Sequence, residues 1–429
     1  MATRGDPAAP AADPVAAVAA LTPTLRAGCA DTDRARALPT AVAAALREAG
    51  VFRLLVPRDV GGAEADPVTV LDVVEAAAYA DGSVGWCVMA GACTGAFAGM
   101  LPLAGAQAIF GDPAAIGAGN FRRDGVAHEV AGGYRVTGRW TLGSGSSHAT
   151  WYVAGCQVHR DGQPVVGPAG APLVREVFVP AAAVEVLDTW ESTGLRGTAS
   201  HDYAVTDVFV PAAHTAWFQD PPRCPGALYR LPPIALFAAV IGAVPLGIAR
   251  HALEAFAALA AAKPRLSADR RRVDRTLADL PVAQAAYGRA HARVAAGRAY
   301  LTQTVADLWG RVQAGHAPGL ADRGALWLAA THAAHSALEA IDALYTTAGA
   351  SAVYAGCPLD RCLRDARTAA QHVCTQEANF ELAGQRLLGR AAAPGVWGLD
   401  YRGEDRPPPT GAGAPAPPDA ATAGPGPAR

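Results

Sequence analysis

The sequence predicts a mainly α-helical protein with a β-domain in its middle, and three observations support this prediction. Alanine-rich stretches of helical texture fill the chain from about residue 15 to 115. Between about 116 and 230 the texture changes to short alternating runs separated by glycine and proline, which is typical of strands. From 231 to 394 long alanine-rich stretches return, and their short connections predict an antiparallel four-helix bundle.

The two ends of the chain differ in composition from these three regions. Residues 1–14 are rich in alanine and proline, and residues 395–429 are rich in proline, glycine and alanine. Because such segments hold few large apolar side chains, we expect both to be disordered. The first also lacks the apolar stretch of a signal peptide.

The bulk composition excludes some classes of partner. The chain has 429 residues and a net charge of −2, from 36 basic and 38 acidic side chains, so no broad basic field for nucleic acid is expected. Its eight cysteines form no Cys-x-x-Cys pair. In a chain of this length they are expected to be reduced thiols of a cytoplasmic protein.

Two uncharged stretches, 82–111 and 231–249, are long enough to span a membrane. The first is rich in small residues and contains Pro102, and the second contains three prolines and two glycines. Neither has flanking basic clusters or an aromatic belt. We therefore expect helices buried inside a large helical assembly and no membrane span.

The helical and extended elements follow from local pattern. In the N-terminal region, residues 41–50 predict a helix that stops at Gly50, residues 52–57 predict a short extended piece, and residues 69–80 predict a second helix. Strands are predicted at 134–140, 151–155, 175–180 and 203–211. The helices of the bundle are predicted at 234–262, 273–314, 323–349 and 359–388.

Several motifs resemble those of the acyl-CoA dehydrogenase superfamily, whose domain order matches the one predicted above. Residues 133–145 and 148–151 resemble the family's middle-domain strand and turn. Residues 194–202 and 358–372 resemble its branch of flavin-dependent monooxygenases. The similarity covers about residues 35–390. It implies the acyl-CoA dehydrogenase fold, with an N-terminal helical domain, a barrel-like middle domain and a C-terminal four-helix bundle.

The branch also implies a function. Its members include oxygenase components that hydroxylate p-hydroxyphenylacetate or a steroid-derived phenol, or oxidise the sulfur of dibenzothiophene. They take reduced flavin, FMNH2 or FADH2, from a separate NAD(P)H:flavin reductase, and react it with O2 to form a flavin C4a-hydroperoxide. Likeness to this branch implies a reduced-flavin-dependent monooxygenase that hydroxylates an aromatic, phenolic or polycyclic substrate, assembled as a homotetramer.

The position of the dehydrogenases' catalytic glutamate departs from the family pattern. Val373 stands where that glutamate removes an α proton from an acyl thioester, and valine cannot act as a base. His372, one position earlier, is a base suited to neutral pH. The resemblance implies that His372 is catalytic, either deprotonating a phenol or hydrogen-bonding the hydroperoxide. The alternative for His372 is a core histidine with structural partners only.

The resemblance also assigns residues to the flavin. A monooxygenase needs a dry pocket and a controlled hydrogen bond at flavin N5. Ser144 matches the residue whose hydroxyl meets N5, and Leu142 matches a residue that lines the flavin face. Asn120, just before the expected first strand, and Trp190 and Thr198, in the middle-domain loop, are expected near the ring. For Ser144 the alternative is an ordinary turn serine, and for Trp190 core packing.

Other motifs restrict the cofactors. The family's Arg-x-x-Phe-Gly segment, which helps hold the FAD pyrophosphate, is missing at 263–272, where basic residues remain, so FMN and FAD both stay open. The chain has no dinucleotide or Walker fingerprint, consistent with a separate reductase. His332 and His335 share a helix face but have no acidic or cysteine neighbour, so no metal site is expected.

Three alternatives to aromatic hydroxylation stay open. The first is N-oxygenation of an amine or amino sugar on the same scaffold. The second is an acyl-CoA dehydrogenase-like oxidoreductase with a relocated carboxylate, for which Glu377 and Glu381 are candidates. The third is an inactive scaffold that binds no flavin. The small side chains of residues 91–96 would leave room for a large substrate.

Overall fold

The computed structural model describes residues 13–167, 170, 172–266 and 272–390. The tails expected to be disordered, apart from residues 13 and 14, lie outside these ranges, as do residues 267–271 of the basic segment 263–272. The N-terminal region holds α1 (Pro14–Ala27), α2 (Cys29–Ala35), α3 (Thr40–Glu48), α4 (Pro67–Ala80), α5 (Gly82–Gly95) and α6 (Leu103–Phe110).

The extended piece expected at 52–57 is not a strand. It begins with a 3₁₀ turn, η1 (Val51–Arg53), which follows Gly50 in the left-handed region at φ 71°. The Arg53 carbonyl accepts hydrogen bonds from the backbone N–H groups of Val56 and Ala63, so the chain folds back on itself. Local hydrogen bonding thus replaces strand pairing, although the segment is apolar and buried.

Aspartates begin the two helices that lead to the centre of the molecule. Asp66 accepts hydrogen bonds from the backbone N–H groups of Val68 and Thr69 at the start of α4. Asp81 ends α4 and accepts from the N–H of Val84 at the start of α5. Each carboxylate satisfies amides that a helix start leaves without partners. The end of the helix predicted at 69–80 is therefore confirmed at Ala80.

The middle region forms one sheet, with strand order β6-β7-β2-β1-β3-β5-β8 and β4 paired to β3. The β1–β3 pair is parallel and the other pairs are antiparallel. The strands are β1 (Gly117–Val130), β2 (Gly133–Gly143), β3 (Trp151–Arg160), β4 (Gln163–Pro164), β5 (Val174–Pro180), β6 (Glu185–Leu187), β7 (His201–Pro211) and β8 (Thr215–Ala216).

Strand β1 corrects the placement of Asn120. Asn120 was expected to precede the first strand, but it lies inside β1, next to a shift in the β1–β3 register between Asn120 and Gly125. The bulged residues include three charged side chains in succession, 122–124, which break the alternation that marks a strand in sequence.

The C-terminal region is a bundle of α7 (Pro233–Ala262), α8 (Pro281–Gln313), α9 (Leu320–Ala348) and α10 (Pro358–Ala369), followed by α11 (Ala378–Leu387). A hairpin of β9 (Pro264–Leu266) and β10 (Arg272–Thr276) joins α7 to α8, so α8 begins later than the sequence predicted. Among the described helices, α7 alone is long and apolar enough to cross a membrane, and 89% of its most apolar window is buried in the protein.

The single helix predicted at 359–388 is wrong, because the chain turns between α10 and α11. Side chains satisfy the backbone carbonyls there: the Thr375 hydroxyl donates to Ala369 O and His372 O, and the Asn379 amide donates to Val373 O. Such side chain to backbone bonds compete with helix continuation. His372 therefore lies in a turn between two helices.

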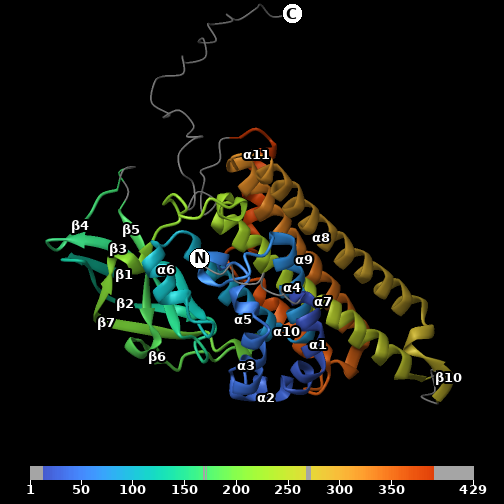
Figure 1. Ribbon diagram of the computed structural model, residues 1–429. Helices are drawn as coiled ribbons and strands as arrows, with labels where there is room; N and C mark the ends of the chain where they lie inside the picture. The colour runs from blue at the N-terminus through green and yellow to red at the C-terminus, as the bar shows by residue number, and fades with distance from the viewer. Residues whose placement is uncertain (1–12, 168–169, 171, 267–271, 391–429) are drawn as a thin grey trace, which may run out of the picture.

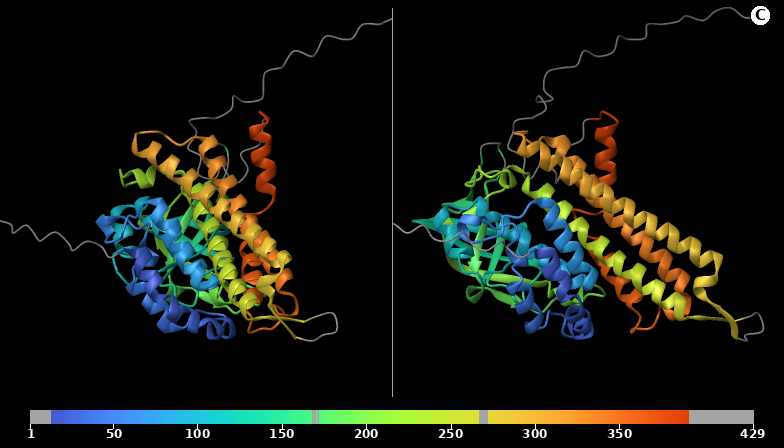
Figure 2. Two further views of the ribbon diagram at one scale, coloured as in Figure 1. Left: turned by 90° about the vertical axis from the view of Figure 1, so that its right-hand side faces the viewer. Right: turned by 45° about the vertical axis from the view of Figure 1, so that its right-hand side comes forward.

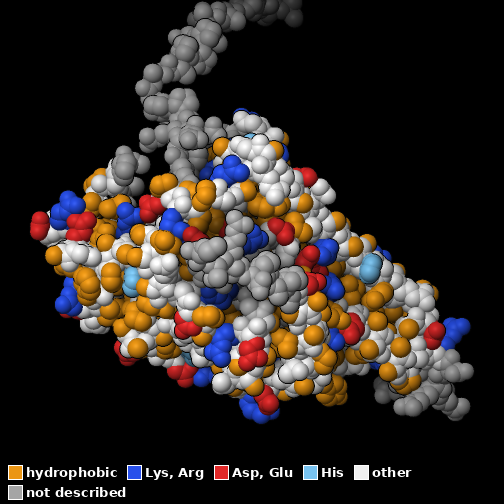
Figure 3. Space-filling model, in the orientation of Figure 1, with side chains coloured by type: hydrophobic (Ala, Val, Ile, Leu, Met, Phe, Trp, Pro, Cys, Tyr) orange, Lys and Arg blue, Asp and Glu red, His pale blue; other side chains and the backbone are white. Residues whose placement is uncertain are grey.

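The three regions pack so that the N-terminal helices lie between the sheet and the bundle (Figure 1). Helix α5 contacts both β1 and α7, and α4 packs on α7. Helix α11 stands at the end of the bundle, against α9 (Figure 2). The face in Figure 3 mixes acidic and basic side chains, in keeping with the near-zero net charge. This packing brings α5, the loop ends of the sheet and the α10–α11 turn together.

Candidate active site

The turn that ends β2 has an unusual backbone. Leu142 has a φ of 62° and Gly145 a φ of 88°, and the Ser144 N–H donates to the Leu142 carbonyl at 2.9 Å. The Leu142 side chain is 52% exposed. A leucine held in the left-handed region, with its side chain in solvent, costs free energy, and such strain clusters at functional sites. The turn thus presents an apolar surface beside a hydroxyl.

A chain of hydrogen bonds fixes the Ser144 hydroxyl. Ser144 Oγ accepts from Trp86 Nε1 at 3.0 Å and lies 2.8 Å from Ser200 Oγ. Ser200 Oγ lies 2.6 Å from Thr198 Oγ1, which donates to the Leu195 carbonyl at 2.8 Å. Because Thr198 donates to a carbonyl, Ser200 donates to Thr198 and Ser144 donates to Ser200. One lone pair of Ser144 Oγ is left for a further donor.

His372 reaches this chain through Trp86. The two rings lie 5.7 Å apart between centroids, edge to face. The Cys374 N–H points at His372 Nδ1 at 3.2 Å, so Nδ1 is the acceptor and Nε2 carries the proton of the neutral ring. Burial lowers the pKa of His372 to about 4. At neutral pH the imidazole is therefore an uncharged donor at Nε2.

A second imidazole, that of His148, belongs to the same β2–β3 turn as Ser144. The His148 N–H donates to Gly145 O at 3.1 Å, and its ring packs 5.6 Å from the Phe52 ring. Burial lowers the pKa of His148 to about 4. No role was predicted for His148, because its neighbour Phe52 is far away in sequence.

A buried ion pair locks these elements together. Asp365 of α10 accepts the backbone N–H of Leu195 at 2.6 Å, and Arg361 lies 3.5 Å from Asp365 and 2.5 Å from Asp81. Burial raises the pKa of Asp365 to about 6, and the Arg361 cation opposes that rise. One network thus joins α10, the start of α5 and the middle-domain loop that carries Thr198.

Two further predicted residues support the site's backbone. The Asn120 amide donates to the Thr141 carbonyl at 3.0 Å and accepts the Arg122 N–H at 2.9 Å, so Asn120 braces the chain next to Leu142. Trp190 Nε1 donates to Leu195 O, the carbonyl that Thr198 also uses. In this structure the side-chain polar groups of Asn120 and Trp190 are therefore occupied by protein partners.

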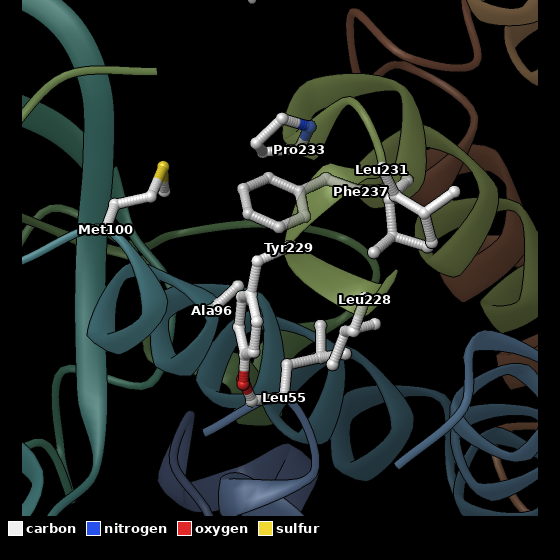
Figure 4. Close-up of a pocket in the computed structure, with 9 residues that line it drawn as sticks. Leu55, Ala96, Met100, Leu228, Tyr229, Leu231, Pro233 and Phe237 are labelled. Atoms are coloured by element: carbon white, nitrogen blue, oxygen red, sulfur yellow. The ribbon is translucent and has the colours of Figure 1, made fainter. Parts of the chain in front are cut away.

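A small apolar cavity of about 20 Å³ lies between η3 (Ala96–Gly99), η7 (Ala227–Arg230) and α7 (Figure 4). It is lined by Leu55, Ala96, Met100, Leu228, Tyr229, Leu231, Pro233, Leu236 and Phe237. Its polar atom, the Tyr229 hydroxyl, donates to Leu55 O at 3.2 Å. The Phe237 ring stacks at 5.9 Å on Phe121, the residue after Asn120, so the cavity adjoins the aromatic packing beside the candidate site.

The histidine pair on α9 is engaged by protein groups. His335 Nε2 lies 3.1 Å from Thr375 O, and His332 Nε2 lies 3.4 Å from Ser336 Oγ. Within the described ranges no group of three or more His, Cys, Asp or Glu side chains is arranged to hold a metal ion.

The fold and the buried hydroxyl–imidazole site agree with comparisons to known proteins. The family models for the acyl-CoA dehydrogenase N-terminal and C-terminal domains match residues 17–108 and 239–377. The chain is 30% identical over 378 residues to indole-3-acetate monooxygenase of Pseudomonas putida, covering 86% of this chain and 92% of that protein.

Two further comparisons point the same way. The oxygenase subunit HsaA, a flavin-dependent monooxygenase of Rhodococcus jostii, is 31% identical, with 82% of this chain and 92% of that protein covered. The structure of XiaF from a Streptomyces species, in complex with FADH2 and glycerol, superposes with a TM-score of 0.80 at 26% identity and covers 89% of this chain and 96% of that one.

The chain thus belongs to the acyl-CoA dehydrogenase superfamily, in its branch of flavin-dependent monooxygenases. It is an oxidoreductase of the oxygenase-component type. The sequence predictions of superfamily, fold class and enzyme class are confirmed.

Proposed function

We propose that the protein is the oxygenase of a two-component system and hydroxylates an aromatic ring. A separate NAD(P)H:flavin reductase would supply the reduced flavin, FMNH2 or FADH2. The names of the relatives support the substrate class, since they act on indole-3-acetate or belong to flavin-dependent oxygenase subunits.

The observation that carries the proposal is the directed chain of hydroxyl groups ending at Ser144. Ser144 accepts from Trp86 and donates to Ser200, so it has room for one more donor and for no acceptor. The N5 atom of a reduced flavin bears a proton and is a donor, whereas N5 of an oxidised flavin is an acceptor. The polarity of Ser144 therefore fits the reduced form.

The surface around Ser144 fits the flavin ring as well. Leu142 presents its exposed side chain from the same turn, which suits the flat apolar face of an isoalloxazine. Thr198 and Ser200 are buried and orient Ser144 without reaching solvent themselves. When bound, reduced flavin supplies the electrons that activate O2. Leu142 would contact the ring and Ser144 would accept the hydrogen bond from N5.

His372 is proposed as the second catalytic group. Its Nε2–H is a neutral donor beside Trp86, and burial keeps the ring uncharged at neutral pH. Donation of a hydrogen bond to an oxygen atom is therefore favoured over the alternative of proton abstraction. Removing a phenolic proton through Nε2 would require the ring to release its bond with the Cys374 N–H and change tautomer.

The assembly, compartment and domain limits also stay proposals. A homotetramer is supported by large apolar side chains that are exposed in the single chain: Val353, Tyr354, Leu387 and Leu388. A cytoplasmic location is supported by the eight cysteines, all of which are free thiols. We propose domains at 15–115, 116–230 and 231–394, and the element bounds from Pro14 to Leu387 are consistent with the first two limits.

The three alternatives to aromatic hydroxylation rest on different residues. Glu377 and Glu381, the candidates for a relocated dehydrogenase base, are both exposed, and Glu381 accepts from Gln385 on the same helix. N-oxygenation of an amine uses the same flavin site and needs no base at His372. An inactive scaffold would bind no flavin.

The proposal is tested by supplying the protein with chemically reduced FMN or FADH2, ¹⁸O2 and a panel of phenols and indoles. We expect one labelled oxygen atom in the product, and the same result when a flavin reductase with NADH replaces the chemical reductant. Product formed from an acyl thioester without oxygen incorporation would contradict the proposal. A labelled amine oxide in place of a ring alcohol would favour N-oxygenation.

A further inference from the structure

His148 holds a buried polar atom that the proposed mechanism does not use. Its Nε2 is shielded from solvent and has no hydrogen-bond partner in the described part of the chain. Its Nδ1 lies 3.3 Å from Ser147 Oγ, so only one of the two nitrogens has a protein neighbour. A buried polar atom without a partner costs free energy unless a bound molecule supplies one.

The free nitrogen faces the turn that carries Ser144. His148 Nε2 lies 3.3 Å from the position that a Cβ atom would occupy on Gly145, where the backbone has a positive φ. A side chain at residue 145 would crowd the imidazole. His372 approaches the same turn through Trp86. Two buried imidazoles therefore lie near Ser144, one from its own β2–β3 turn and one from the α10–α11 turn.

No charged side chain accompanies the two imidazoles. Burial alone lowers the pKa of His148 and of His372, with no contribution from a neighbouring charge. Arg53, next to Phe52, donates instead to the carbonyls of Asp112 and Val60.

The other cations on adjoining elements are also engaged. Arg122 pairs with Asp124, Arg123 lies over the Trp217 ring, Arg196 donates to Ser192 O and Asp33 O, and Arg361 pairs with Asp81. Among the described residues, none of these guanidinium groups contacts His148 or the Ser144 turn, so none is placed there to balance a ligand carboxylate. Burying an unpaired carboxylate is far more costly than burying a neutral ring.

We propose that the substrate is an electrically neutral aromatic compound whose ring O–H or N–H donates to His148 Nε2. This inference rests on the proposed function and narrows its substrate class. In the proposed tautomer of His148, Nδ1–H donates to Ser147 Oγ and Nε2 is an acceptor, whereas Nε2–H of His372 is a donor. One imidazole can therefore accept a hydrogen bond from the substrate, and the other can donate one. Substrates with a carboxylate, such as indole-3-acetate, lack a partner for their charge.

The direct test compares two ligands with the same ring. Binding of indole and of indole-3-acetate to the full-length protein is measured by isothermal titration calorimetry, first without flavin and then with reduced FMN under anaerobic conditions. We expect indole to bind at least about tenfold more tightly. Equal affinity, tighter binding of indole-3-acetate, or binding of neither ligand would overturn the proposal.

Variants locate the polar contact. His148→Phe keeps a ring but removes the acceptor, and we expect it to weaken indole binding about tenfold, the effect of losing one hydrogen bond. His148→Gln restores a polar group and should recover part of the affinity. His159→Phe on β3 is the matched control, because His159 lies beside His128 on the sheet, away from the Ser144 turn.

Reduced-flavin affinity and the midpoint of thermal unfolding are recorded for each variant. Unchanged indole affinity in a folded His148→Phe protein would refute the role of His148. If that variant does not fold, the comparison of the two ligands in the unmodified protein still decides the proposal. Failure of the proposed function would appear separately, as absence of reduced-flavin binding in the unmodified protein.

Discussion

Titration of His372 gives a prediction whose size follows from the structure. The folded ring has a pKa of about 4, whereas an imidazole in an unfolded chain has a pKa of about 6.5. Between these values the unfolded state binds the extra proton, so the unfolding free energy contributed by His372 rises with pH from about 4 to 6.5 and is constant above. A difference of about 2.5 pKa units corresponds to about 3 kcal/mol. Because relaxation of the protein and water penetration reduce the penalty of burying a charge, we expect about 2 kcal/mol.

The assay is urea unfolding of the unmodified protein and of His372→Gln at several pH values between 4.5 and 8. The difference between the two curves isolates His372. This is needed because Asp365, with its raised pKa of about 6, contributes the opposite slope as pH rises from about 4 to 6. We expect the unmodified protein to lose about 2 kcal/mol relative to the variant as pH falls through that window. Parallel curves would refute the claim that His372 is a buried neutral imidazole.

Three substitutions test other parts of the site. Ser144→Ala removes one hydrogen bond at the flavin, so reduced flavin should still bind. Its reoxidation by oxygen, followed by stopped-flow absorbance, should become about tenfold faster. An unchanged rate would exclude Ser144 from the flavin contact. Gly145→Ala places a Cβ atom on a left-handed backbone beside His148. Urea unfolding should show a free energy of unfolding lower by about 2 kcal/mol, and an unchanged value would contradict the strained turn. Asp365→Asn removes one carboxylate partner of Arg361 and should lower the free energy of unfolding by about 2 kcal/mol. The measurement is the midpoint of thermal unfolding, which should fall. Asp342→Asn, in the exposed pair with Arg367, is the control and should leave the midpoint unchanged.

The fold was predictable because the local sequence pattern identifies its largest helices and strands. Alanine-rich repeats mark α7, α8 and α9, and alternation marks β2, β3, β5 and β7. The errors fall where side chains bond to the backbone or where a bulge breaks the pattern. Thr375 and Asn379 interrupt the last predicted helix, and the charged run at 122–124 conceals β1.

The candidate site was only partly predictable. Motifs pointed to Ser144, Thr198 and His372, and the structure brings the first two into one hydrogen-bonded chain that contacts the third through Trp86. Trp86 itself was not predicted, since its partner Ser144 lies 58 residues away in the chain. The neutral state of His372 depends on burial by distant elements, which no local pattern records.

The fate of reduced flavin on the protein tests the central claim most directly. Anaerobic protein carrying one equivalent of reduced FMN or FADH2 is mixed rapidly with oxygenated buffer, and oxygen consumption and flavin absorbance are followed together. A site built around Ser144 and His372 predicts that oxygen is consumed well before oxidised flavin appears. Oxidised flavin that forms at the rate of a protein-free control, with an equivalent of hydrogen peroxide, would contradict the account.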